Sequence, residues 1–410
     1  MSPILTLLIQ IVVVLGVARA FGAGMRWLGQ PRVVGEMVAG LVLGPSVFGH
    51  FAPSAAAQVF PLQSVGTLEA FSHLGLVLYM LLVGVRMDAA HLRAKGGLVA
   101  GISVIGIVVP FVIGLAVAYP LVTRFGIPDA SRTAFLLFVG LSLSMTAFPV
   151  LVRIVGEHGL DRTRLGTTAI AAASFNDVLA WAALALVTSL VGTQQATVAG
   201  TVGQLAAYGL VMAVAIGPLL RAQLRRTRSA EGRFVLVLLV ALASAAATEA
   251  MGIHPLFGSF LVGVLLSGEA GMSAFLASWI EPLTVTLLLP LFFASTGLKI
   301  NAALVPEGGL LVLMGLVILL AVAGKIIPPT LVARLGGFSW REAMGLGALM
   351  NTRGMVEIVL LVVGLDSGLL PPPLFTILAL MAFVTTAMTA PLLTLLGFAG
   401  GVTPVDEAGY

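Results

Sequence analysis

An all-α fold that crosses a membrane many times is predicted by the composition of this 410-residue chain. Hydrophobic residues make up 59% of it and charged residues only 9%, whereas soluble domains carry roughly 25% charged residues. The mean hydropathy is +1.12. Nearly every stretch of about 20 residues is apolar enough to span a bilayer. No segment is therefore left that could make a soluble domain.

Clusters of charged residues, proline and glycine divide the chain into apolar segments that we expect to be helical. Thirteen spans are predicted, of which the ninth is short enough to be re-entrant. Their expected ranges are 3–27, 32–49, 66–86, 96–121, 132–154, 164–191, 197–220, 233–250, 253–268, 279–298, 307–333, 342–364 and 372–397.

The basic residues predict how these spans are oriented. If the loops lie alternately on two sides, one side holds most of the lysines and arginines and the other only Arg124, Arg132 and Lys299. Because basic loops stay in the cytoplasm, the N-terminus is expected outside and the C-terminus inside. We expect a multi-pass protein of the bacterial inner membrane.

Several classes of function are disfavoured by what the sequence lacks. There is no cysteine, which excludes disulfides and thiolate metal sites. No phosphate-binding loop of the ATPase type and no zinc-protease or serine–lysine pattern occurs, so neither ATP drive nor an intramembrane enzyme is expected, and no cofactor is predicted. The basic pI of about 9.8 is explained by loop orientation, so nucleic acid is not an expected partner.

Two of the predicted spans are interrupted. In the fifth, Pro149 lacks an N–H and its ring clashes with the carbonyl of Met145, which frees that carbonyl beside the hydroxyl of Thr146. In the twelfth, Asn351, Thr352, Arg353 and Gly354 follow one another at membrane depth. A proline kink or a small-residue packing face is the alternative reading of each.

The positions of the two interruptions favour a repeat. Counted as six spans, a linker span and six spans, the interrupted span is the fifth of each half. This pattern is typical of two inverted six-helix repeats whose discontinuous helices cross at the midplane.

The sixth span carries Asp177 directly after Asn176. A carboxylate at this depth is costly unless it meets water, an ion or a counter-charge. Carboxylate, amide, hydroxyl and carbonyl oxygens are the ligands that hard cations prefer. Asp177, Asn176 and Thr146 therefore form a candidate site for a monovalent cation and a proton.

Two further groups of charged residues lie within the spans. Lys325, in the eleventh span, is expected to face the same crevice as Asp177 and to act as a charge partner that sets the working pH. The alternative is an ion pair that only locks helices, although such pairs are weak evidence for stability. Arg353 and Glu357 are four residues apart and either neutralise each other or act directly.

Five segments resemble the monovalent cation:proton antiporter family, especially its plant-type cation/proton exchanger branch. They are Gln30 to Ser46, Leu141 to Arg153, Ser174 to Trp181, Pro290 to Lys299 and Leu349 to Glu357. The resemblance implies exchange of K⁺ or Na⁺ for H⁺ by elevator-like alternating access in a homodimer surrounded by lipid. A sodium-coupled organic-anion symporter and a channel are the alternatives.

The same resemblance implies a division of the chain and roles for single residues. Dimerisation and scaffold helices are expected in 1–95 and 192–300, a core transport domain in 96–191 and 301–398, and a short cytoplasmic tail in 399–410. Asp177 is similar to the family's ion-binding aspartate, Thr146 to the polar residue of the unwound helix, and Lys325 to the lysine before the second broken helix. Many electrogenic members have two adjacent aspartates, and Asn176 replaces the first of them, so electroneutral exchange is expected.

Overall fold

The computed structural model describes residues 2–30, 32–86, 96–160, 163–192, 198–251, 255–301 and 309–398. The described part is helical almost throughout and contains no β-strand. The predicted all-α fold is therefore confirmed.

The first half of the chain contains the first discontinuous helix, formed by α8 and α9. Its helices are α1 (Pro3–Trp27), α2 (Arg32–Leu43), α3 (Phe48–Phe51), α4 (Pro53–Val59), α5 (Leu62–Val85), α7 (Gly96–Arg124), α8 (Asp129–Ser144), α9 (Phe148–Glu157) and α10 (Arg164–Gly192).

The second half contains the second discontinuous helix, formed by α18 and α19, and two short π-helical turns, η1 and η2. Its elements are α11 (Val198–Val211), η1 (Met212–Ile216), α12 (Gly217–Arg226), α13 (Ala230–Ala250), α14 (Pro255–Leu266), α15 (Met272–Leu283), η2 (Thr284–Leu288), α16 (Leu289–Lys299), α17 (Leu310–Leu335), α18 (Trp340–Met350), α19 (Met355–Asp366) and α20 (Pro372–Leu395).

Each predicted span overlaps a helix or a run of consecutive helices. Within the described residues, nine helices or runs of consecutive helices are long and apolar enough to cross a membrane. The count of thirteen crossings stays a prediction. The span expected at 32–49 is not continuous, because α2 ends at Leu43, before Pro45, which has no N–H to continue the helix. The tenth runs longer than expected, because η2 joins α15 to α16 without a break.

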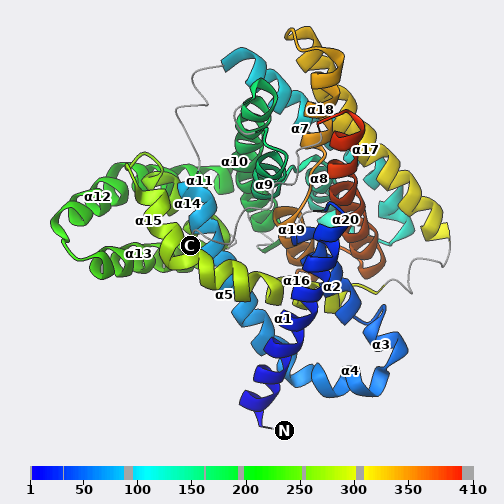
Figure 1. Ribbon diagram of the computed structural model, residues 1–410, viewed down its shortest axis with the longest axis horizontal. Helices are drawn as coiled ribbons and strands as arrows, with labels where there is room; N and C mark the ends of the chain where they lie inside the picture. The colour runs from blue at the N-terminus through cyan, green and yellow to red at the C-terminus, as the bar shows by residue number, and fades with distance from the viewer. Residues whose placement is uncertain are drawn as a thin grey trace.

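The helices pack as two sets. In the first, α7 packs against α8, α10 and α17, and α18 packs against α10, α17 and α20. In the second, α5 packs against α14, α15 and α16, and α2 packs against α1 and α16. The first set fills the upper and right part of Figure 1, whereas α11 to α15 lie at the left.

Helices α2 and α16 approach closely because glycines lie at their crossing. A Cβ atom added to Gly40 would lie 2.1 Å from the carbonyl oxygen of Phe293, and one added to Gly297 would lie 1.9 Å from the carbonyl oxygen of Gly40. Small residues allow membrane helices to pack backbone against backbone. This contact fixes α16 beside α2.

We predict that Gly40→Ala lowers the free energy of unfolding by about 1–3 kcal/mol, because the added methyl group must push two backbones apart. Thermal unfolding of the detergent-purified protein measures the change. Gly24→Ala is the matched control, since a Cβ atom there meets nothing within 4 Å. Equal melting temperatures of the two variants would contradict the close packing.

Candidate functional site

The first discontinuous helix breaks where the sequence predicted. α8 ends at Ser144 and α9 begins at Phe148. Between them Met145 and Ala147 have extended backbone conformations. Pro149 lies in the first turn of α9, where the missing N–H has no helical partner to lose. The break leaves the last carbonyls of α8 without helical hydrogen bonds.

The second discontinuous helix breaks between Met350 at the end of α18 and Met355 at the start of α19. The two breaks touch, because the backbone N–H of Ala147 donates to the carbonyl oxygen of Thr352 at 2.9 Å. The expected crossing of two discontinuous helices is thus confirmed.

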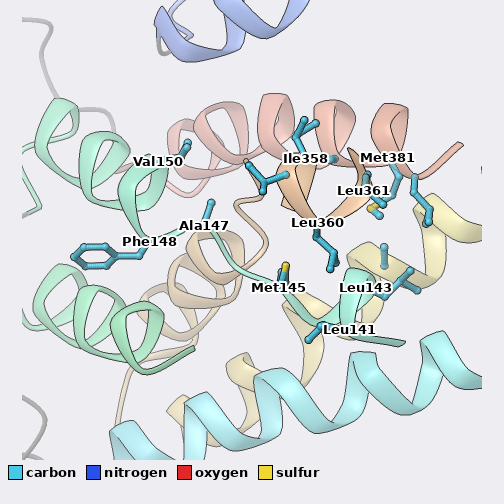
Figure 2. Close-up of a cluster of buried hydrophobic side chains, with 14 of the residues drawn as sticks. Leu141, Leu143, Met145, Ala147, Phe148, Val150, Ile358, Leu360, Leu361 and Met381 are labelled. Carbon is cyan, nitrogen blue, oxygen red and sulfur yellow. The ribbon is translucent and has the colours of Figure 1, made fainter. Parts of the chain in front are cut away.

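Apolar side chains surround the crossing. Figure 2 shows Met145 and Ala147 on the extended stretch after α8, with Leu143 of α8 and Ile358 and Leu360 of α19 nearby. All five residues are buried. Electrostatic interactions at the crossing therefore act in a medium of low dielectric constant.

Lys325 of α17 is fully buried and binds three oxygen atoms around the first break. Its Nζ atom donates to the carbonyl oxygen of Gly106 at 2.8 Å, to Thr146 Oγ1 at 2.8 Å and to the carbonyl oxygen of Ser144. Ser144 is the last residue of α8. The ammonium group therefore lies at the negative end of the α8 dipole, where a cation is stabilised.

Arg353 binds the same helix end. Its Nη1 atom donates to the carbonyl oxygen of Ser142 at 2.7 Å, and its Nη2 atom donates to that of Leu143 at 2.6 Å. Nη1 also lies 2.9 Å from Glu357 Oε1, and both side chains are buried. Arg353 thus pairs with Glu357 as expected and also closes the end of α8, whereas its direct role in transport stays a prediction.

Thr146 lies at the centre of this network. Its hydroxyl donates to the carbonyl oxygen of Met350 at 3.0 Å and accepts from Lys325 at 2.8 Å and from Asn176 Nδ2 at 3.4 Å. Asn176 Oδ1 is buried and has no hydrogen-bond partner in the described part of the chain. Such an unpaired buried oxygen is costly and is available to a cation.

The remaining polar residues of the second break face α20. Asn351 Nδ2 donates to the carbonyl oxygen of Thr385 at 3.3 Å, and Thr352 Oγ1 donates to Thr389 Oγ1 at 3.4 Å. These two residues support the break and do not join the contacts of Thr146.

The structure therefore brings together Thr146, Asn176 and Lys325. The backbone of Asp177 continues α10 directly after Asn176. The side chains of Asp177 and Pro149 lie outside the described residues, so the pairing of Asp177 with Lys325 stays a prediction.

Sequence reasoning missed the carbonyl groups of Gly106, Ser142, Leu143 and Ser144 as partners of the buried cations. A glycine carries no side-chain signal. The carbonyls of Ser142 and Leu143 could have been found, because a predicted helix end always leaves free acceptors.

Comparison with known proteins is informative over nearly the whole chain. The profile of the family described as "Sodium/hydrogen exchanger, transmembrane" matches residues 11–395. The chain is 35% identical over 398 residues to the Na⁺/H⁺ antiporter NhaS4 of Synechocystis sp., covering 95% of this chain and 97% of that protein.

Two eukaryotic relatives are longer. The chain is 38% identical over 393 residues to Cation/H⁺ antiporter 17 of Arabidopsis thaliana, covering 94% of this chain and 48% of the relative. It is 32% identical over 432 residues to K⁺/H⁺ antiporter 1 of Saccharomyces cerevisiae, covering 100% of this chain and 49% of the relative. The chain thus spans about half the length of these two relatives.

A solved structure shares the fold. The sodium proton antiporter MjNhaP1 of Methanocaldococcus jannaschii at pH 8 matches with a TM-score of 0.69 and 15% sequence identity, covering 98% of both chains.

We predict that Arg353→Gln lowers the free energy of unfolding by roughly 3–5 kcal/mol, because it leaves the buried Glu357 carboxylate without its cation. Thermal unfolding measures the change. Arg226→Gln, at the exposed end of α12, should shift stability by no more than about 0.5 kcal/mol. Adding Glu357→Gln to Arg353→Gln should recover part of the loss, and no recovery would argue against coupling of the pair.

Proposed function

Because the chain belongs to the sodium/hydrogen exchanger family, we propose that this multi-pass membrane protein exchanges a monovalent cation, K⁺ or Na⁺, for a proton. One observation carries the proposal. At the crossing of two discontinuous helices, Asn176 donates through Nδ2 to the Thr146 hydroxyl, and its buried Oδ1 has no hydrogen-bond partner among the described residues. The next residue along α10 is Asp177.

In the proposed cycle Asp177 carries either a proton or the cation. The ionised carboxylate, Asn176 Oδ1 and Thr146 Oγ1 form an oxygen set suited to a hard monovalent cation. Protonation removes the charge that attracts the cation. One site therefore holds the two substrates alternately, and this competition couples their movements.

Lys325 would take part as a resident competitor. Its ammonium group is held by one hydroxyl and two carbonyl oxygens, which are the same kinds of ligand that a monovalent cation uses. In this arrangement the Thr146 hydroxyl already accepts from two donors and donates to a third group. A cation that binds Thr146 must displace Lys325 or Asn176 from it. The strength with which the Lys325 ammonium group holds Thr146 thus controls how easily the cation binds. In this way Lys325 sets the pH at which the cation can replace the proton.

The names of the relatives specify different cations. The Synechocystis protein is named a Na⁺/H⁺ antiporter and the yeast protein a K⁺/H⁺ antiporter. Both names support cation/proton exchange. Organic-anion symport is not favoured, because Lys325 and Arg353, the cations that could receive an anion, are already engaged with protein carbonyls and Glu357.

We propose an elevator movement of residues 96–191 and 301–398 against the scaffold of 1–95 and 192–300. Lys299 of α16 lies 2.7 Å from Asp366 of α19 and 3.1 Å from Glu69 of α5, so it joins a discontinuous helix to the scaffold. These ion pairs are partly exposed and each is worth little, as suits a contact that must break. A scaffold-mediated homodimer in a bacterial inner membrane, with the N-terminus outside and the C-terminus in the cytoplasm, completes the proposal.

We predict that Asp177→Asn abolishes exchange in proteoliposomes with an internal pH dye, because an amide neither releases a proton nor balances the cation's charge. Addition of K⁺ or Na⁺ to the outside should then leave the internal pH unchanged. Asp129→Asn, at the exposed start of α8, is the matched control and should retain exchange. Cation-driven proton flux in a well-folded Asp177→Asn protein would remove Asp177 from the mechanism.

We also predict one-for-one, electroneutral exchange. With Asn176 before Asp177, each half-cycle carries either one cation or one proton. At a fixed cation gradient, the equilibrium pH difference should not change when a membrane potential is imposed. An electrogenic cycle would feel about 2.3 kcal/mol per elementary charge at 100 mV. A pH difference that shifts with voltage would identify Lys325 as a second proton carrier to test.

A further inference from the structure

A cavity of about 290 Å³ lies between α1, α2, α9 and the η2–α16 helix. Four arginines line it: Arg19 and Arg26 of α1, Arg32 of α2 and Arg153 of α9. One carboxylate, that of Glu36, also lines it. The volume is close to the lower end of the range of about 300–1,000 Å³ found for ligand pockets.

The sequence of α1 builds one wall of this cavity. Arg19 and Arg26 are seven residues apart, so they lie on one face of the helix, two turns from each other. Gly22, between them, and Ala18 and Ala23 also line the cavity. These small residues leave room between the two guanidinium groups.

The arginines form one electrostatic group. All four guanidinium groups line the same cavity, so their positive charges act on one another. Arg153 already pairs with Glu157 at 3.1 Å. In the described part of the chain, Arg19, Arg26 and Arg32 make no hydrogen bond or ion pair with another side chain. Glu36 alone cannot balance these three cations, and the cavity carries a net positive charge.

This charge makes the cavity a poor path for a cation and a good receptor for an anion. Guanidinium groups match phosphate oxygens with paired, charge-assisted hydrogen bonds. Arg26 lies in the last turn of α1, and Arg32 begins α2. Basic residues at the ends of membrane helices lie at the depth of lipid headgroups.

We propose that this cavity binds a phosphate group, supplied by the headgroup of an anionic phospholipid or by a free phosphate ion. The phosphate bridges Arg19 and Arg26 of α1, Arg32 of α2 and Arg153 of α9. Because α9 is the second half of the first discontinuous helix, the bound group ties that helix to α1 and α2. The cavity shares no lining residue with the proposed cation site.

Thermal unfolding of the full chain in detergent tests the proposal. Wild-type protein is measured with phosphatidylglycerol, with phosphatidylcholine and with inorganic phosphate. Phosphatidylglycerol or inorganic phosphate should raise the melting temperature, because a ligand that binds only the folded state stabilises it, and phosphatidylcholine should not. A rise with the lipid alone identifies a headgroup, and an equal rise with inorganic phosphate identifies the free ion.

Variants locate the site. Arg26→Gln and Arg32→Gln should each weaken the apparent affinity about tenfold, since each removes a charge-assisted hydrogen bond. Arg26→Lys keeps the charge, so its apparent affinity should fall less. This variant keeps the test decisive if the Arg26→Gln protein does not fold. Arg226→Gln, at an exposed position of α12, should bind as the wild type does. No specific stabilisation of the wild type, or equal stabilisation of every variant, would overturn the proposal.

Discussion

The structure depends on closing the carbonyl end of α8 inside an apolar environment. Two cationic side chains meet this end: Lys325 binds the carbonyl of Ser144, and Arg353 binds those of Ser142 and Leu143. An unpaired carbonyl in this medium would be costly, and an unpaired cation would cost more. The two cations therefore supply the hydrogen-bond donors that the α8 carbonyls lack, and the carbonyls supply acceptors for the two cations. The end of α18 needs no cation, because its Met350 carbonyl accepts from the Thr146 hydroxyl.

This closure makes the two halves of the chain interdependent. The carbonyls belong to the first half, whereas both cations come from the second, 181 residues further along the chain for Lys325 and 211 for Arg353. Neither half can satisfy its buried polar groups alone. Glu357 offsets the charge of Arg353. On the proposed function Asp177 offsets the charge of Lys325, so the four ionised groups sum to zero before a substrate binds.

The sequence predicted those features of the fold that depend on residues close together along the chain, namely the helices and the two helix breaks. Hydropathy located the helices, and Pro149 and the polar run from Asn351 to Gly354 located both breaks. The ligands of Lys325 depend instead on how α17 is rotated against α7 and α8, which no local pattern encodes. One of them is the carbonyl of Gly106, a residue without a side chain. The span expected at 32–49 was predicted too long, because its apolar pattern continues past Pro45, where the helix has already ended. The arginine cavity was not predicted, because its four arginines come from three separate helices.

The ammonium group of Lys325 also affects how easily a transport site at the crossing can release its cation. Conduction and exchange require binding strong enough to admit an ion and weak enough to let it leave. A fully dehydrated oxygen cage with no competitor would bind tightly, and its empty state would leave several buried oxygens unpaired. Lys325 binds one oxygen of the proposed site, Thr146 Oγ1, and the neighbouring carbonyl oxygens of Gly106 and Ser144, so the empty state is stabilised and the net gain on cation entry falls. On the proposed function, the contacts of Lys325 that close the broken helix also moderate the affinity of the cation site, so stability and exchange would share these hydrogen bonds.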